Sequence, residues 1–244
     1  MKDKIFNKKK MKISDFKFDK KVVSAFDNMI SRSVPFYNES QDTAVRLAKE
    51  YYKKNTKVID IGCSTGTTLI KLFKKLSPEE RKTIQMIGYD SSNPMIKEAE
   101  RKTSNKKFKK KIKFINNEIQ NLKIEKNVSV CFMNYTLQFI RPIDRQNIVS
   151  KIYKCLNKGG AFIFMEKILS KDSDISRIFI DVYHKYKLEM GYTDIEINKK
   201  REALENVLIP YRDEENYELL EKSGFKKIEK FFKWFNWSGI IAVK

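Results

Sequence analysis

The chain has 244 residues, which is enough for one α/β domain with a buried core and some additional helices. Its net charge of +20 at pH 7 suggests nucleic-acid binding, but 42 of the 51 basic residues are Lys, spread along the chain, and only 9 are Arg. Dispersed Lys is typical of a solvated surface, so we expect no direct nucleic-acid binding.

The hydropathy and the numbers of Cys and His residues indicate which kinds of protein and site to expect. No apolar run approaches the ~20 residues that span a bilayer, so we expect no membrane segment. The three Cys, an odd number, and the lack of an apolar segment behind the basic N-terminus predict a cytoplasmic protein with reduced thiols. No Cys pair has zinc-ligand spacing and there is one His, so we expect no metal site.

The N-terminal part divides into a tail and a helical cap. Residues 1–16 are rich in Lys and predict a flexible basic tail, whereas residues 17–244 predict a single α/β domain. Within that domain, residues 17–55 predict two helices that cap the ligand site. Pro35 separates these helices, because proline lacks an N–H and disfavours helix at the preceding residue. Tyr37 lies at the break, a position from which a phenol can reach a ligand.

After the cap, residues 58–67 predict a strand, a glycine loop and the start of a helix. An apolar strand at residues 58–61 includes Asp60 and is followed by a small polar loop between Gly62 and Gly66, with a helix from Thr67. The glycines allow φ > 0 and close backbone approach, and the helix N-terminus offers free N–H groups. This unit predicts a nucleotide-type ligand site, although short glycine loops also occur as purely structural turns.

The next strand strengthens the ligand-site interpretation. Residues 86–90 predict a buried strand that ends in Asp90 and is followed by Ser91. An acid at this place can accept hydrogen bonds from both hydroxyls of a ribose. The loop lacks the G-x-G-x-x-G spacing of dinucleotide-binding folds and instead reads D-x-G-x-S-x-G. This form resembles the class I S-adenosyl-L-methionine (SAM) methyltransferase fold, which implies that Asp60 and the loop lie near the methionine moiety.

The remaining elements complete a Rossmann-like α/β sheet. Strands at residues 113–117 and 128–133 end at Glu118-Ile119 and at Asn134, on the edge where open α/β sheets bind ligands. We expect the rest in this order: a helix at 144–156, a strand at 161–168, a helical insertion at 170–210, a helix at 214–223, and a closing hairpin at 227–234 and 237–243. This order predicts a seven-stranded, mostly parallel sheet of the SAM-methyltransferase type, with helices on both faces.

Several stretches together resemble one family, the carboxy-S-adenosyl-L-methionine (carboxy-SAM) synthases, over residues 17–244. The glycine loop is generic, but R-S-V-P-x-Y and K-R-x-x-L-E-N-V are far more selective. The matching stretches are Arg32-Ser33-Val34-Pro35-Phe36-Tyr37, Asp60-Ile61-Gly62-Cys63-Ser64, Asn134-Tyr135-Thr136-Leu137-Gln138-Phe139, Lys200-Arg201-Glu202-Ala203-Leu204-Glu205-Asn206-Val207 and Phe235-Asn236-Trp237-Ser238-Gly239.

The resemblance implies conversion of SAM and prephenate into carboxy-SAM and phenylpyruvate, without a metal and by a homodimer. A tRNA carboxymethyltransferase would use the product to make 5-oxyacetyluridine at the wobble position. Ser91 and Glu118 depart from the family's usual Asn and Asp but keep polar or acceptor chemistry. By resemblance, Arg201 holds the added carboxylate and is the catalytic candidate, and SAM is held by Tyr37, Gly62, Cys63, Ser64, Asp90, Ser91, Glu118, Ile119 and Asn134.

The chemistry of Arg201 agrees with this implied role. A guanidinium can bind a carboxylate through two parallel hydrogen bonds, which Lys cannot do. The alternative is a surface Arg that pairs with Glu202 or Glu205. For prephenate, a dianion, Lys200 and Arg32 are further cationic candidates because they belong to the selective motifs.

Two other functions remain open on the sequence. The first is a SAM-dependent methyltransferase that acts on RNA or a small molecule, which needs no Arg for a carboxylate. The second is a non-catalytic RNA-binding protein with this fold, which predicts tRNA affinity with a steep salt dependence.

Overall fold

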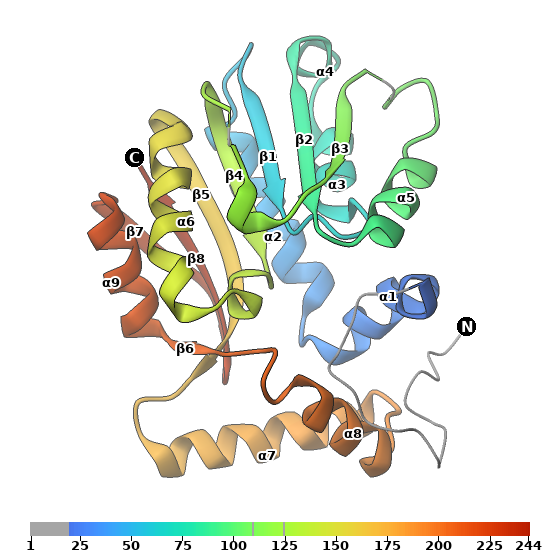
Figure 1. Cartoon of the computed structure of the whole chain (residues 1–244), viewed down its shortest axis with the longest axis vertical. Helices are drawn as coiled ribbons and strands as arrows, with labels where there is room; N and C mark the ends of the chain where they lie inside the picture. Colours follow the sequence, from blue (N-terminus) through green and yellow to red (C-terminus); the bar gives the residue numbers. More distant parts are fainter. Residues whose placement is uncertain (1–19, 109, 124) are drawn as a thin grey trace.

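The structure, a computed structural model, describes residues 20–108, 110–123 and 125–244, so the predicted tail at 1–16 lies outside the described residues. Its centre is a sheet with the strand order β3-β2-β1-β4-β5-β8-β7 (Figure 1). The bounds of these strands are β1 Lys57–Ile61, β2 Gln85–Asp90, β3 Ile112–Asn116, β4 Val128–Asn134, β5 Leu156–Leu169, β7 Lys227–Trp234 and β8 Trp237–Val243.

The predicted seven-stranded, mostly parallel sheet is confirmed. Strands β1 to β5 are mutually parallel, β8 runs antiparallel to β5, and β7 runs antiparallel to β8. One short strand was not predicted, β6 (Tyr211–Arg212), which pairs with the end of β5. β5 also begins earlier than predicted, because the backbone at Gly159 and Gly160 hydrogen-bonds with the backbone of Lys244 instead of forming an isolated turn.

Helices cover both faces of the sheet. One core cluster packs α2, α3 and α5 against one face, and a second packs α6 and α9 against the other. Within β4, Val130 and Phe132 belong to the first cluster, whereas Cys131 and Met133 belong to the second. This burial on both faces explains the continuous apolar run of the strand. The helix bounds are α1 Lys20–Ser33, α2 Tyr37–Tyr51, α3 Thr67–Lys75, α4 Pro78–Thr83, α5 Asn93–Lys102, α6 Pro142–Cys155, α7 Ser173–Glu189, α8 Asp194–Leu204 and α9 Asp213–Ser223.

Of the two predicted cap helices, α1 lies with the insertion at one end of the sheet, whereas α2 packs against one face of it. Figure 1 shows α1, α7 and α8 beyond the carboxyl ends of the parallel strands, the edge where such sheets bind ligands. The insertion is two helices, separated at Gly191, which has φ 82°. α8 begins with a capping box in which Thr193 and Glu196 bond each other's backbone N–H. No helix in the described ranges is long and apolar enough to cross a membrane.

Candidate functional site

The glycine loop, residues 62–66, joins β1 to α3 at the carboxyl edge of the sheet. The N–H groups of Gly62 and Cys63 both donate to the carbonyl of Tyr89, at 2.8 and 2.9 Å, which ties the loop to β2. Gly62 has φ +75°, and a Cβ added there would lie 2.2 Å from Oγ1 of Thr136. The backbone conformation and the close neighbour both require glycine at this position.

Asp90, the predicted ribose-binding acid, ends β2. Its Oδ2 accepts the N–H of Ser64 and its Oδ1 accepts the N–H of Ser92, each at 2.8 Å. Burial is the main reason that the pKa of Asp90 is raised, these two hydrogen bonds oppose the rise, and the charge of Glu118 adds to it. Each carboxylate oxygen keeps a second acceptor site, so Asp90 can still bind two hydroxyls.

A buried acid that the sequence analysis did not single out fixes the segment after β4. Glu166 of β5 accepts the N–H of Leu137 with Oε1 and that of Gln138 with Oε2, both at 2.9 Å. Burial raises the pKa of Glu166 to about 8, against the effect of those N–H groups and of Arg145. These bonds hold the polar–aromatic segment that follows Asn134 at the carboxyl edge. An acid inside the apolar run of β5 is the sequence signal that points to it.

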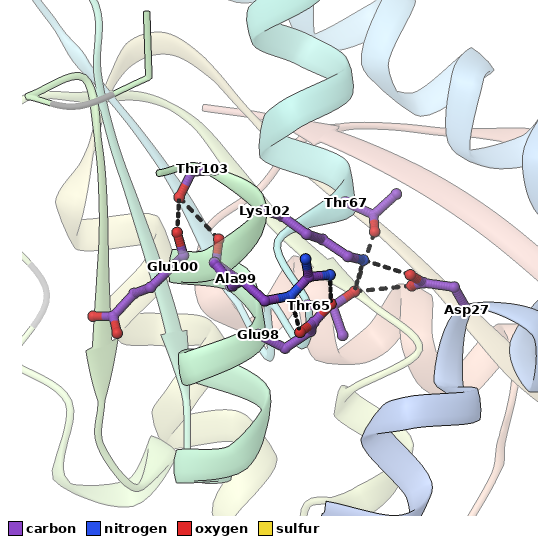
Figure 2. Close-up of polar contacts among 9 residues, drawn as sticks. Asp27, Thr65, Thr67, Glu98, Ala99, Glu100, Lys102 and Thr103 are labelled. Atoms are coloured by element: carbon purple, nitrogen blue, oxygen red, sulfur yellow. Dashed lines mark hydrogen bonds and ion pairs between the residues drawn. The ribbon is translucent and has the colours of Figure 1, made fainter. Parts of the chain in front are cut away.

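Three side chains, which we call the cap clamp, join α1 to the glycine loop and α5. They are Asp27, Thr65 and Lys102 (Figure 2). Oγ1 of Thr65 donates to Oδ1 of Asp27 at 2.9 Å and accepts from Nζ of Lys102 at 2.8 Å. Lys102 and Asp27 also form an ion pair. Because partly exposed ion pairs contribute little to stability, we assign the clamp the role of placing α1 over the loop.

A cavity of about 730 Å³ lies at this edge, within the usual size of small-molecule sites. Glu118 is exposed and lies outside the lining, so its predicted role in binding SAM stays a prediction. The structure brings the other predicted residues together, since the lining includes Tyr37, Gly62, Cys63, Ser64, Asp90, Ser91, Ile119, Asn134 and Arg201.

Several buried polar atoms on this lining have no hydrogen-bond partner within the described part of the chain. They are Oδ2 of Asp60, Oε1 of Gln41, both Oδ1 and Nδ2 of Asn134, and Nε1 of Trp237. Gln41 is held by donating Nε2 to Tyr37 and Thr68, at 3.1 and 3.2 Å. Buried polar groups are almost always hydrogen-bonded, so these atoms indicate a ligand that carries both donors and acceptors. SAM, with its ammonium, carboxylate, hydroxyl and adenine groups, fits that requirement.

The other end of the cavity carries four cations, with Glu202 and Glu205 also in its lining. Arg201 makes no ion pair with Glu202 or Glu205, or with any other acid in the described ranges, so the surface-pairing alternative is not observed. The sequence analysis did not single out two of these cations, Lys167 and Lys187, because nothing in the sequence distinguishes them from the other lysines of a Lys-rich chain. The lysines that line the cavity with Arg201 are Lys167 of β5, Lys187 of α7 and Lys200 of α8.

The two cations suggested for prephenate have different surroundings. Lys200 lines the cavity and donates from Nζ to Oγ of Ser33 at 2.8 Å. Arg32 is not among the lining residues; its Nε donates to the carbonyl of Met190 at 2.9 Å, and its guanidinium lies 4.1 Å from the ring centroid of Tyr192. Arg32 therefore joins α1 to the segment between α7 and α8.

The cysteines and acids of the site give no sign of thiolate or metal chemistry. Cys63, Cys131 and Cys155 are free and buried. Burial, with the charges of Asp60 and Asp90, raises the pKa of Cys63 well above its usual range, so this residue contributes its backbone and not a nucleophile. No group of three or more His, Cys, Asp or Glu in the described ranges is arranged to hold a metal ion.

Solved structures of methyltransferases share this fold. One is a putative SAM-dependent methyltransferase from Methanococcus maripaludis. The superposition covers 96% of this chain and 97% of the methyltransferase chain, with a TM-score of 0.62 at 19% identity. Another is an O-methyltransferase family protein from Burkholderia thailandensis. The superposition covers 93% of this chain and 60% of the Burkholderia chain, with a TM-score of 0.66 at 12% identity. At these identities the likeness shows the fold alone.

Sequence comparisons are more specific. A family model described as a methyltransferase domain matches residues 52–223. The carboxy-S-adenosyl-L-methionine synthase of Nautilia profundicola is 43% identical over 244 residues, which is 100% of both chains. That of Campylobacter lari is 44% identical over 244 residues, again 100% of both chains. With relatives this similar along its whole length, and with the glycine loop, Asp90 and Arg201 at one cavity, the chain belongs to the carboxy-S-adenosyl-L-methionine synthase family of transferases.

Proposed function

We propose that the protein converts SAM and prephenate into carboxy-SAM and phenylpyruvate. One observation carries the proposal: a single cavity joins the glycine loop, at a SAM-type position, to Arg201 and three lysines. SAM is a cation and needs acceptors, whereas prephenate is a dianion and needs cations. The two ends of the cavity match these two charges, and the curated relatives are named carboxy-SAM synthases.

The reaction needs little acid or base from the protein. Prephenate loses its ring carboxylate as CO2 and its ring hydroxyl as hydroxide when the ring becomes aromatic, which leaves phenylpyruvate. The hydroxide takes a proton from the sulfonium methyl of SAM, giving water and an ylide. The ylide carbon then attacks CO2, which forms the new C–C bond and the carboxylate of carboxy-SAM.

The chain's own residues bind, orient and exclude water. Asp90 holds the ribose, the loop from Gly62 to Ser64 places the methionine moiety, and Arg201 binds the newly formed carboxylate with two N–H groups. The cap holds water away from the ylide, which water would otherwise protonate. A plain methyltransferase does not explain Arg201, which lines the cavity and forms no ion pair with an acid in the described ranges.

Mass spectrometry tests this function directly. Purified protein is incubated with SAM, with and without prephenate, and the adenosyl products are weighed. We expect a derivative heavier than SAM by one CO2, formed only with prephenate, together with phenylpyruvate. Unmodified SAM in both samples, from folded protein that binds SAM, would contradict the proposal and favour a search for methyl acceptors.

Protons should be released when SAM binds, because of Asp60. Burial and the charge of Asp90 raise the pKa of Asp60 from 3.8 to about 7, so the carboxyl group is about half protonated at neutral pH. A sulfonium or ammonium beside Asp60 lowers that pKa, and we expect about half a proton to be released at pH 7. Titration calorimetry in two buffers of different ionisation enthalpy measures the release. In Asp60→Asn it should vanish; unchanged release in this variant would assign the proton elsewhere.

The same group affects stability in the absence of SAM. The folded protein holds more protons on Asp60 than the unfolded chain does between about pH 4 and pH 7, so this residue lowers the free energy of unfolding as pH rises through that window.

We further propose a cytoplasmic homodimer whose product serves a tRNA carboxymethyltransferase. The described surface supports the dimer, since Ile175 and Ile178 on α7 are 47% and 59% exposed. Apolar side chains neighbouring on an inserted helix are typical of an interface between subunits.

A further inference from the structure

Two lysines from different elements meet at one aromatic ring in the cavity. Nζ of Lys187, on α7, lies 4.4 Å from the centroid of the Tyr183 ring, and Nζ of Lys167, on β5, lies 5.5 Å from it. Both lysines are half-buried. Neither forms an ion pair with a carboxylate anywhere in the described ranges.

The free protein bears an electrostatic cost for this arrangement. Burial is the main cause that lowers the pKa of Lys187 to about 7, and the charges of Lys167, Lys200 and Arg201 lower it further. Burial also lowers the pKa of Lys167, with a contribution from Arg201. Half-buried cations without a counter-ion are unfavourable, so a cluster of this kind is typical of a site that binds an anion.

An aromatic wall runs from these lysines toward the glycine loop. Tyr183 packs edge-on against Trp237 at 5.6 Å between centroids, Trp237 packs against Tyr135 at 5.7 Å, and Tyr135 packs against Tyr37 at 5.9 Å. All four rings line the same cavity as the glycine loop. The hydroxyl of Tyr183 donates to the carbonyl of Ser33 at 2.6 Å, which fixes the ring that both amines approach. The wall offers an apolar surface to an unsaturated ring whose acid group reaches the lysines.

We propose that Lys167 and Lys187 together bind the side-chain carboxylate of prephenate, the one that phenylpyruvate retains. This inference rests on the proposed function and names the substrate contacts of that site. The choice between the two carboxylates follows from the chemistry: the ring carboxylate must leave as CO2, and two ammonium groups on it would stabilise the charge that has to be lost. The side-chain carboxylate keeps its charge throughout, so it can be held firmly. Arg201 is then left to bind the carboxylate that is transferred.

Anion binding at this subsite should take up protons. A carboxylate beside Lys187 favours the charged amine and raises its pKa above about 7, so at pH 7 we expect an uptake of about half a proton. The titratable and charged groups that line this end with it are Lys167 of β5, Tyr183 and His184 of α7, and Lys200, Arg201, Glu202 and Glu205 in and after α8; neither glutamate forms an ion pair with Lys187.

Calorimetry on the full chain, saturated with S-adenosylhomocysteine to prevent turnover, tests the subsite. The titrants are phenylpyruvate and its neutral counterpart phenylacetone, in which a methyl group replaces the carboxylate, at pH 7 in two buffers. We expect phenylpyruvate to bind with proton uptake, and phenylacetone to bind about tenfold or more weakly without it. Equal binding of the two compounds would overturn the proposal.

Variants assign the effect to individual amines. Lys187→Met and Lys167→Met should each weaken phenylpyruvate binding about tenfold, whereas Lys187→Arg should bind it without proton uptake, since Arg stays charged. Lys185→Met is the matched control, because Lys185 is an exposed lysine on the same helix, and it should behave as the wild type. Wild-type affinity in both Met variants, or full proton uptake in Lys187→Arg, would assign the anion to other residues.

The outcome is separable from the proposed function. Wild-type protein that makes carboxy-SAM from prephenate, with an unchanged KM for prephenate in Lys187→Met, would overturn the subsite alone. Lysine-dependent phenylpyruvate binding in a protein that makes no carboxy-SAM would overturn the function and keep the subsite. S-adenosylhomocysteine affinity, measured in each variant, reports whether the protein is folded.

Discussion

Replacing Arg201 with alanine is expected to lower the rate of carboxy-SAM formation about 100-fold, while SAM still binds. Two charge-assisted hydrogen bonds to a carboxylate are worth about 3 kcal/mol together, and each ~1.4 kcal/mol is a factor of ten in rate. SAM itself lacks the added carboxylate, so its affinity should change little. The measurements are the rate of carboxy-SAM formation by mass spectrometry and the Kd for SAM by calorimetry.

Two variants make this result specific to Arg201. Arg201→Lys keeps the charge but loses the paired geometry, and we expect an intermediate rate. Arg46→Ala removes an exposed guanidinium from α2 and should leave the rate unchanged. If Arg201→Ala kept the wild-type rate, the carboxylate would have to be bound elsewhere, and Lys200 on the same helix would be the next residue to replace.

Gly62→Ala is expected to abolish measurable SAM binding and to lower the free energy of unfolding by about 2–5 kcal/mol. The left-handed backbone costs a non-glycine residue roughly 1–2 kcal/mol, and overpacking adds roughly 1–3 kcal/mol. The new Cβ would overlap Cβ, Oγ1 and Cγ2 of Thr136, at 2.8, 2.2 and 2.5 Å, so the backbone has to move. That movement displaces the loop that places the methionine moiety. Urea unfolding and SAM titration measure the two effects.

A second glycine provides the control for backbone strain alone. Gly159 has nearly the same φ, +76°, but nothing lies within 4 Å of an added Cβ. Gly159→Ala should therefore destabilise by about 1–2 kcal/mol and leave SAM binding unchanged. If the free energy of unfolding fell equally in the two variants, the close approach of Thr136 would not contribute to the loss. Backbone strain alone would then explain the need for glycine at position 62.

Much of the fold could be predicted because its signals are local. The apolar strand before Gly62 and the acid at the end of the next strand are each visible within about ten residues. Their spacing then specifies one strand–helix–strand unit. Pro35 likewise marks the break between the cap helices without any tertiary information, and the structure has α1 ending at Ser33 and α2 beginning at Tyr37.

The missed features depend on contacts between distant segments. Lys167 and Lys187 lie on β5 and α7, and only the packing of the insertion against the end of the sheet brings both of them to the ring of Tyr183. In a chain with 42 Lys, residue type alone cannot identify them. Glu166 is a different case: an acid in the middle of an apolar strand is visible in the sequence, but its two N–H partners on the segment after β4 are not.

The cap clamp has a kinetic consequence. Thr65 belongs to the loop that lines the cavity, and its hydroxyl is shared between Asp27 on the cap and Lys102 on α5. α1 cannot swing away without breaking these bonds, so opening of the cap and loosening of the loop become one event. We therefore expect the residence time of a bound nucleoside to depend on the clamp, and dissociation to quicken as salt screens the Asp27–Lys102 pair. A reactive sulfonium product would thereby remain enclosed until a single opening frees it.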